Sequence, residues 1–181
     1  MTAIDPVISI VITSCMATLF GVAAVHKFQA PGVFKQSLKD YQLLPAALAS
    51  TMALIFPVAE LSAAVLILYP TTQLYAAALM MGLLSVYTAA IGLNLYRGKT
   101  DLDCGCAGPA SKQTLSGFLV LRNTLLIGLV FITLFPTITR TLNWMDILVI
   151  AFSVLTATSL YAGLNRLFAQ SRQLLQLRHS S

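Results

Sequence analysis

Two cysteines separated by a single glycine, Cys104-Gly105-Cys106, are the residues of this chain best suited to chemistry. Such a pair can alternate between a dithiol and a small-ring disulfide, because glycine lacks a Cβ and tolerates the backbone angles that bring the two sulfurs together. A small ring is strained, and strain makes a disulfide easier to reduce. We therefore interpret the pair as a redox site. Two incidental small residues, or half of a metal site, are the alternatives that remain open.

A zinc site around the pair is not expected. A closed zinc site normally needs four ligands, and the chain offers only three further cysteines or histidines, namely Cys15, His26 and His179. The reactivity of the pair depends on its thiolate fraction. Charges of both signs flank it and leave that fraction undecided: Lys99, Asp101, Asp103 and Lys112.

The composition identifies an integral membrane protein. The 181 residues are 57% hydrophobic and only 9% charged, and the mean hydropathy is +0.83, whereas soluble domains carry about 25% charged residues. The net charge of +5 does not indicate nucleic-acid binding, because the eleven Lys and Arg are scattered between apolar runs. No basic residue precedes the first apolar run, so we expect that run to remain as a helix and not to be a cleaved signal.

Five apolar stretches of about 20 residues are long enough to cross a bilayer as helices. They predict an all-α fold, a polytopic integral membrane helical bundle that forms one domain over residues 1–181. Residues 97–113, here called the cysteine loop, connect the third stretch to the fourth. Residues 27–41 are expected to form an interfacial turn or short helix, and 165–181 a basic tail. The predicted spans cover residues 6–25, 45–69, 73–96, 114–135 and 144–164.

Basic residues predict the orientation. Nine of them fall in the first connection, the cysteine loop and the tail, which five spans place on one side, and only Arg140 falls on the other. The positive-inside rule then puts the N-terminus outside and both the cysteine loop and the C-terminal tail in the cytoplasm. The nine residues are Lys27, Lys35, Lys39, Arg97, Lys99, Lys112, Arg166, Arg172 and Arg178.

Four polar or reactive side chains inside or beside the spans are candidates for supporting roles. Glu60 lies deep in the second span, where a carboxylate is costly unless it is protonated or paired. Arg122 in the fourth span is its expected partner, in a contact that either serves the chemistry or only fixes helix packing. Cys15 is expected to pack as a small hydrophobe, or else to relay thiol exchange. His26 is expected to be an interfacial residue, or else a proton shuttle.

The third span is expected to contribute packing alone. Its small residues, among them Ala76 and Ala77, allow close approach of neighbouring helices. Tyr87 and the methionines Met80 and Met81 are interpreted as packing residues and not as a cofactor site.

Several short motifs follow one another along the chain in a distinctive order. They are His26-Lys27-Phe28, Asp40-Tyr41-Gln42-Leu43-Leu44-Pro45, Pro57-Val58-Ala59-Glu60-Leu61, Arg97-Gly98, Asp103-Cys104-Gly105-Cys106 and Arg122-Asn123. Together these motifs resemble the MauE family of methylamine-utilisation proteins, within the wider group of DoxX-like redox-associated membrane proteins. The resemblance covers most of the chain from the first to the fourth span.

The resemblance implies a DoxX-like four-helix core in the inner membrane of a Gram-negative bacterium. In that membrane, the orientation predicted from the basic residues puts the N-terminus in the periplasm. It also implies a part in producing active methylamine dehydrogenase, whose small subunit carries several disulfides and a tryptophan tryptophylquinone matured in the periplasm. A thioredoxin-like protein of the MauD type is the expected partner. Cys104 and Cys106 would then be the redox pair. The supporting candidates are Glu60, Arg122, Asp103, His26 and Cys15.

Three functions compete on this basis. The first is a membrane thiol–disulfide oxidoreductase or electron carrier that serves maturation of the dehydrogenase. The second is a non-catalytic scaffold that recruits or stabilises the thioredoxin-like partner. The third, a transporter that uses Glu60, is disfavoured because no inverted repeat or broken-helix pair is evident.

The predicted cytoplasmic side of the cysteine loop conflicts with direct chemistry on periplasmic disulfides. Two accounts resolve the conflict: electrons pass outward to a periplasmic thioredoxin, or the loop is buried in the bundle and reachable from the other side. Quinone exchange is a third option, although no residue marks a quinone site.

Overall fold

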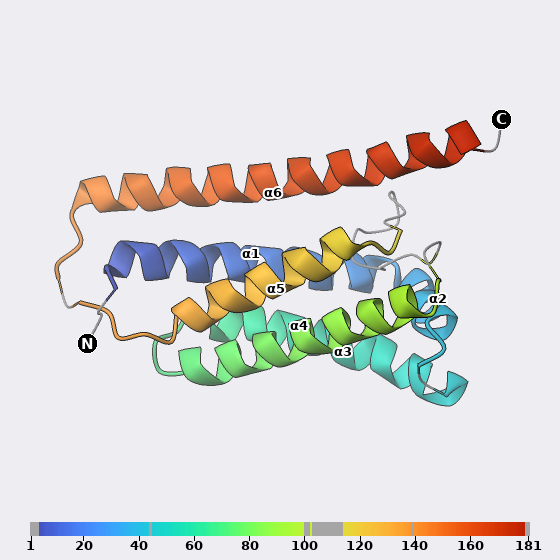
Figure 1. Cartoon of the computed structure of the whole chain (residues 1–181). Coiled ribbons are helices and arrows are strands. Elements are labelled where there is room, and N and C mark those ends of the chain that lie inside the picture. Colours follow the sequence, from blue (N-terminus) through green and yellow to red (C-terminus); the bar gives the residue numbers. More distant parts are fainter. Residues whose placement is uncertain (1–3, 44, 100–101, 103–113, 139, 180–181) are drawn as a thin grey trace.

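The computed structural model describes residues 4–43, 45–99, 102, 114–138 and 140–179, with residue 46 and residues 168–179 described by their backbone alone. Over these ranges the regular elements are all helices, and Ile4 and Thr137 form an isolated bridge. The all-α prediction is therefore confirmed. The helices are α1 (Pro6–Gln29), α2 (Pro31–Asp40), α3 (Ala46–Leu66), α4 (Gln73–Tyr96), α5 (Gly117–Ile132) and α6 (Trp144–His179) (Figure 1).

Helix α1 begins where the sequence predicts and ends later. The Asp5 side chain caps it by accepting a hydrogen bond from the Val7 N–H at 2.8 Å, and Pro6 occupies the first turn, where its missing N–H costs nothing. The predicted end at residue 25 is four residues too early, because α1 continues through His26 and Lys27 to Gln29. Lys27 consequently belongs to the helix and not to a polar connection.

Four helices form the core of the bundle. Helix α1 packs against α3, α3 against α4, α4 against α5, and α5 closes the ring against α1. Helix α2 packs against α3 and α1, and α6 runs alongside α1 (Figure 1). The predicted four-helix core is thus present. Its buried centre comprises Met16, Phe20, Ala63, Ala64, Ile67, Ala76, Ala77, Met80, Leu83, Leu84 and Val130.

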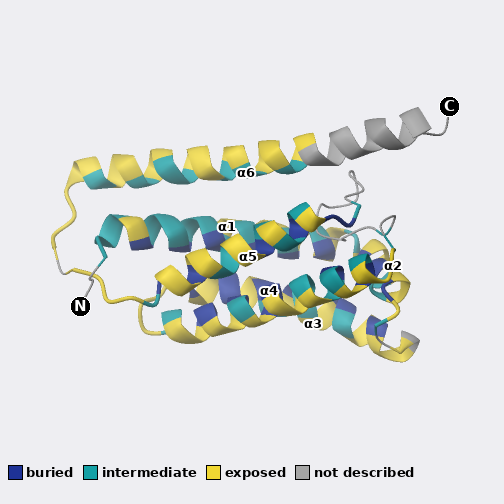
Figure 2. Cartoon of the chain, viewed as in Figure 1, coloured by how far each residue is buried: buried dark blue, intermediate teal, exposed yellow. Residues whose placement is uncertain are grey.

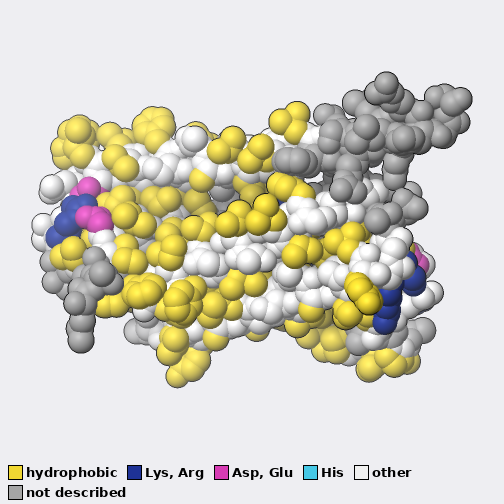
Figure 3. Space-filling model, viewed as in Figure 1, with side chains coloured by type: hydrophobic (Ala, Val, Ile, Leu, Met, Phe, Trp, Pro, Cys, Tyr) yellow, Lys and Arg dark blue, Asp and Glu magenta, His cyan; other side chains and the backbone are white. Residues whose placement is uncertain are grey.

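The outside of the bundle is apolar along its length. In the part of α6 with described side chains, Trp144–Leu167, the hydrophobic window has no buried residue, and large side chains such as Phe152 and Leu155 are exposed (Figure 2). On the face shown in Figure 3, the coloured charged side chains lie at the two ends. Exposed apolar surface of this extent is typical of a surface that faces lipid. The protein is a multi-pass membrane protein.

Helix α5 is shorter than the predicted span 114–135. Its 16 residues extend for about 24 Å, less than the roughly 30 Å of a hydrocarbon core. Ser116 has extended backbone angles before the helix, and tight turns at residues 133–135 follow it. By length and composition, the described helices that can cross a membrane are therefore α1, α3, α4 and the first part of α6.

Candidate functional site

A buried ion pair lies inside the bundle. Lys27 of α1 donates a hydrogen bond from Nζ to Oε1 of Glu60 on α3, and the two residues are only 3% and 2% exposed. The Tyr87 hydroxyl of α4 donates to the same carboxylate oxygen at 2.7 Å. Three helices of the four-helix core therefore meet at one carboxylate. The other oxygen, Oε2, is buried and has no hydrogen-bond partner among the described residues.

Aromatic rings surround the lysine end of this pair. The Lys27 ammonium lies 5.1 Å from the ring centroids of both Phe34 and Tyr87, within range of cation–π attraction. Phe56 of α3 contacts both rings, with centroids 6.3 Å from Phe34 and 5.5 Å from Tyr87. We call these five residues, Lys27, Phe34, Phe56, Glu60 and Tyr87, the buried charge cluster. Within this cluster, the Lys27 ammonium is compensated by the Glu60 carboxylate and by two ring faces. The carboxylate also accepts a hydrogen bond from the Tyr87 hydroxyl, so neither charge is left unpaired inside the membrane bundle.

The predicted partner of Glu60 is wrong. Glu60 pairs with Lys27, whereas Arg122 of α5 donates to Oδ1 of Asn123 at 3.1 and 3.2 Å and to Oδ1 of Asn165 at 3.4 Å. The Arg122 guanidinium also lies 5.9 Å from the ring centroid of Tyr161 on α6. The prediction fails because α1 extends beyond residue 25 and carries Lys27 to the face that Glu60 occupies. Arg122 instead links α5 to α6.

Hydropathy gives no signal for Lys27 and Tyr87, because α1 and α4 are apolar on all sides and the sequence does not mark which face is inside. The packing of the bundle marks it instead. Buried positions of α1 recur at spacings of three and four residues, and this stripe runs through Phe20 and Ala24 directly to Lys27. The stripe of α4 runs likewise through Leu84 and Ile91, with Tyr87 between them.

The cysteine loop begins at a well-defined helix end. Gly98, with φ +74°, follows α4 in the left-handed conformation that glycine adopts at little cost. The Gly98 N–H donates to the Leu95 carbonyl and the Lys99 N–H donates to the Asn94 carbonyl, both at 3.0 Å. This is the Schellman pattern that ends helices. The direction in which the chain leaves α4 is therefore set by backbone geometry.

A small apolar cluster holds the two described flanks of the cysteine pair together. The Leu115 N–H donates to the Leu102 carbonyl at 3.1 Å. Residues 102 and 115, which precede and follow the cysteine pair in the sequence, are therefore adjacent in the structure. Leu102 packs against a cluster of four buried residues, namely Tyr41, Ile91, Leu115 and Leu119. We call these five residues the loop anchor. It defines the end of the bundle where the predicted chemistry would take place.

The remaining predicted site residues fall in different places. Cys104, Cys106 and Asp103 lie outside the described residues, and so does Lys112. Cys15 is a free, half-buried cysteine within α1. His26 is half-buried beside Lys27, and its carbonyl accepts from the Ala30 N–H at the end of α1.

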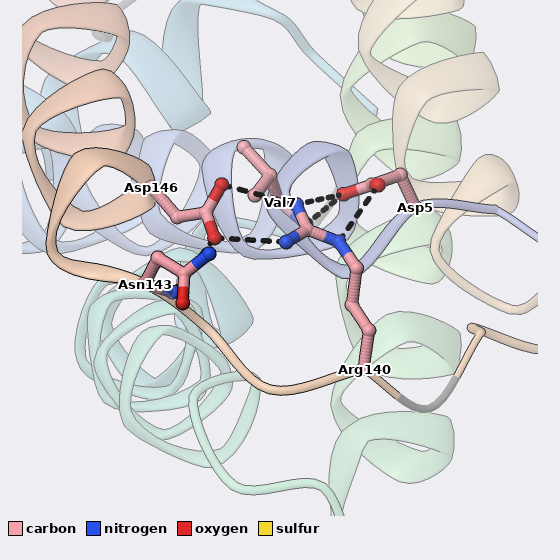
Figure 4. A network of polar contacts seen from close by, with 5 residues as sticks. All are labelled: Asp5, Val7, Arg140, Asn143 and Asp146. Carbon is pink, nitrogen blue, oxygen red and sulfur yellow. Dashed lines mark hydrogen bonds and ion pairs between the residues drawn. The ribbon is translucent and has the colours of Figure 1, made fainter.

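Three charged residues, Asp5, Arg140 and Asp146, form a network of ion pairs at the opposite end of the bundle, here called the clasp (Figure 4). Arg140 donates to both oxygens of Asp5, at 3.1 and 3.2 Å, and to both oxygens of Asp146, at 2.8 and 3.1 Å. Asp146 also accepts from the Asn143 N–H, which caps the start of α6. The clasp ties the beginnings of α1 and α6 together. Hydrogen bonds from Arg140, and next from the Val7 N–H, hold the pKa of Asp5 below its usual value of 3.8.

The lowered pKa of Asp5 predicts a stability contribution that depends on pH. Because the charged form is favoured in the folded protein, the contribution is present above the ordinary pKa of 3.8 and is lost as the pH falls through the lowered value. We expect the thermal midpoint of the wild type to exceed that of Arg140→Gln at neutral pH, and the difference to shrink below about pH 4. The measurement is thermal unfolding in detergent across pH. A difference that stays constant down to acid pH contradicts the clasp.

Comparison with known proteins identifies relatives over most of the chain. Residues 5–136 match the family model described as methylamine utilisation protein MauE. A methylamine utilization protein MauE from Paracoccus denitrificans is 34% identical over 70% of this chain and 68% of its own length. One from Paracoccus versutus is 38% identical over 67% of this chain and 66% of its own. One from Methylorubrum extorquens is 36% identical over 66% of this chain and 64% of its own length. No solved structure matches the chain.

Proposed function

The chain belongs to the MauE family of methylamine utilisation proteins, and we propose that it is a membrane thiol–disulfide redox protein required for maturation of methylamine dehydrogenase. The family ties the chain to methylamine utilisation. The observation that carries the finer proposal is the sequence Cys104-Gly105-Cys106 between flanks that the loop anchor pins to the end of a four-helix bundle. Because the two ends of the loop are held in place, a partner protein would meet the thiol pair at a defined end of the bundle.

The proposed chemistry is exchange with a thioredoxin-like partner. A thiolate of the pair attacks the partner's disulfide, and one partner sulfur leaves as a thiolate while a mixed disulfide forms. The second cysteine of the pair then attacks the sulfur of the first cysteine in the mixed disulfide. The Cys104–Cys106 disulfide forms, the bond to the partner breaks, and the partner leaves as a dithiol. Two electrons and two protons have passed from one dithiol to the other protein's disulfide, and no further oxidant is needed. The reverse sequence reduces the pair by the same steps.

The proposed location is the inner membrane, with the N-terminus in the periplasm and the cysteine loop in the cytoplasm. The burial of Lys27 removes one of the nine basic residues counted for that side, which leaves eight against Arg140. Arg140 is itself neutralised by Asp5 and Asp146. Although α5 is short, Arg140 lies beside Asp5 at the N-terminal end of the bundle, so the chain reaches the side opposite the cysteine loop by residue 140. The charge asymmetry that supports this orientation therefore persists after the buried pair is discounted.

Serine substitution of the pair tests the function. In a host that depends on this chain for growth on methylamine, we expect Cys104→Ser with Cys106→Ser to abolish active dehydrogenase, because serine cannot form the mixed disulfide. The readouts are dehydrogenase activity and the amount of this protein in the membrane. Cys15→Ser is the matched control, and it is expected to retain activity because its thiol packs within α1.

Normal dehydrogenase activity in the double variant would contradict the redox function. That result would favour a scaffold that acts on the partner by binding alone.

A further inference from the structure

We propose that α2 is a positioning strut that connects the buried charge cluster to the loop anchor, with Phe34 and Tyr41 as its two contact residues. Their importance for catalysis rests on the proposed redox function, but their effect on the cysteine loop does not. One face of this short helix contacts the buried charge cluster at Phe34, and the residue that follows the helix, Tyr41, belongs to the loop anchor.

One face of α2 is buried. Phe34, Ser37 and Tyr41 recur at intervals of three and four residues, and their exposed fractions are 5%, 7% and 8%. The other side of the helix carries exposed residues, including Lys39. The buried face therefore fixes the rotation of α2 about its axis.

Phe34 attaches the first half of α2 to the buried charge cluster. Its ring lies over the Lys27 ammonium and meets the ring of Phe56 edge-on, with 75° between the two planes. Lys27 is held in turn by Glu60, and Glu60 by Tyr87. The position of α2 is thus tied to α1, α3 and α4 at once.

Tyr41 attaches the other end of α2 to the loop anchor. It packs in the same buried cluster as Leu102 and Leu115, the residues that close the base of the cysteine loop. Its neighbour Gln42 accepts a hydrogen bond from Lys99 Nζ at 2.6 Å, directly after the end of α4. Gln42 has φ +52°, a left-handed conformation that costs free energy in a residue other than glycine and that the surrounding contacts maintain.

A helix of this length depends on its attachments. Helix α2 has only ten residues, and isolated helices shorter than about 12–15 residues are marginal in water. Loss of the contact at Phe34 should therefore loosen α2 as a unit and reach Tyr41 at its far end. A looser Tyr41 leaves Leu102 and Leu115 less well packed, and we expect Cys104 and Cys106, which lie between these two residues in the sequence, to react faster as a result.

The test measures thiol reactivity in the full-length protein. In a Cys15→Ser background, reduced Cys104 and Cys106 are treated with a small maleimide in lipid nanodiscs, and their reduction potential is measured against glutathione. We expect Phe34→Ala to raise the maleimide rate by about tenfold, as local opening becomes more frequent, and to shift the potential. Tyr41→Ala is expected to do the same.

Phe20→Ala is the matched control. Phe20 is also 5% exposed, but it lies in the main core on α1 and not on α2, so the same atoms are removed at equal burial. Its maleimide rate should stay within about twofold of the parent. Equal rates for Phe34→Ala and Phe20→Ala, whether both raised or both unchanged, would overturn the proposal.

If Phe34→Ala does not fold, Phe34→Leu keeps an apolar side chain and removes only the ring over Lys27. An unchanged rate in that variant would also overturn the proposal. Because thiol modification needs no partner protein, failure of the proposed exchange with a thioredoxin-like partner would leave this result standing.

Discussion

Lys27→Met should destabilise the protein by about 3–5 kcal/mol, because it leaves the Glu60 carboxylate buried without its countercharge. The Tyr87 hydroxyl remains as a donor, but a neutral hydrogen bond does not replace an ammonium ion. For a chain of this size the loss corresponds to a thermal midpoint lower by roughly 10 °C in detergent. The fraction of protein that elutes as a single species in size-exclusion chromatography should fall in parallel.

Lys27→Met combined with Glu60→Gln should recover most of that loss. The double variant removes both charges, and glutamine keeps a carbonyl oxygen for the Tyr87 hydroxyl. Methionine keeps contact with the rings of Phe34 and Tyr87, since its sulfur packs well against aromatic groups. A double variant that is no more stable than Lys27→Met alone would show that charge pairing is not the function of this cluster in the fold.

Ala77→Leu should destabilise the bundle by about 3 kcal/mol, because three further carbon atoms must enter a fully buried helix contact. Ala77 has no exposed surface and lies in the main core with Ala63 of α3. Small residues allow helices to approach closely, and at such a contact no rotamer of leucine fits without moving the helices apart. The measurement is again the thermal midpoint in detergent.

The next residue along α4 provides the control for this substitution. Ala78 is exposed on the outer face, where leucine meets lipid or detergent and is favourable in a membrane-spanning helix. Ala78→Leu should therefore leave the midpoint within about 2 °C of the wild type. Equal losses for the two variants would contradict the assignment of α4 faces.

Most helix positions could be predicted from hydropathy and turn residues. The third predicted span coincides with α4, Gln73–Tyr96, because Pro70 and two threonines end the preceding run. The predicted start of the fifth span coincides with the start of α6 at Trp144, and α6 continues beyond the predicted span end at residue 164 to His179. Close packing at Ala76 and Ala77 is confirmed by their complete burial. These features depend on local sequence and on burial alone.

The contacts of charged residues could not be predicted in the same way. Because Lys27 follows the first apolar run, hydropathy predicts that it lies in a connection, and only the burial pattern of α1 shows that it faces the interior. The sequence predicts a packing role for Tyr87, whereas its hydroxyl contacts Glu60 in the structure. The clasp joins residues that are 135 positions apart, Asp5 and Arg140, and no local pattern predicts such a pair. Tertiary packing decides these contacts.

The structure also changes the interpretation of Glu60. A carboxylate deep in a membrane span is a functional candidate by default, but here it has a countercharge, a hydroxyl donor and an aromatic surround. Among the described residues, it is linked toward the start of the cysteine loop through Lys27, Phe34 and α2. We therefore expect Glu60 variants to affect thiol reactivity through position, in step with Phe34 variants, and not through direct proton exchange with the sulfurs.

The most direct test of the proposed function is the redox state of Cys104 and Cys106 in living cells. Cells carrying the Cys15→Ser chain are treated with a membrane-impermeant thiol reagent, intact and after opening, with and without the thioredoxin-like partner. We expect no reaction in intact cells, where the reagent cannot reach the cytoplasmic side. After opening, we expect the pair to react only when it is reduced, and its oxidised fraction to change when the partner is absent. Two thiols that react fully under every condition, with or without the partner, would contradict the redox function.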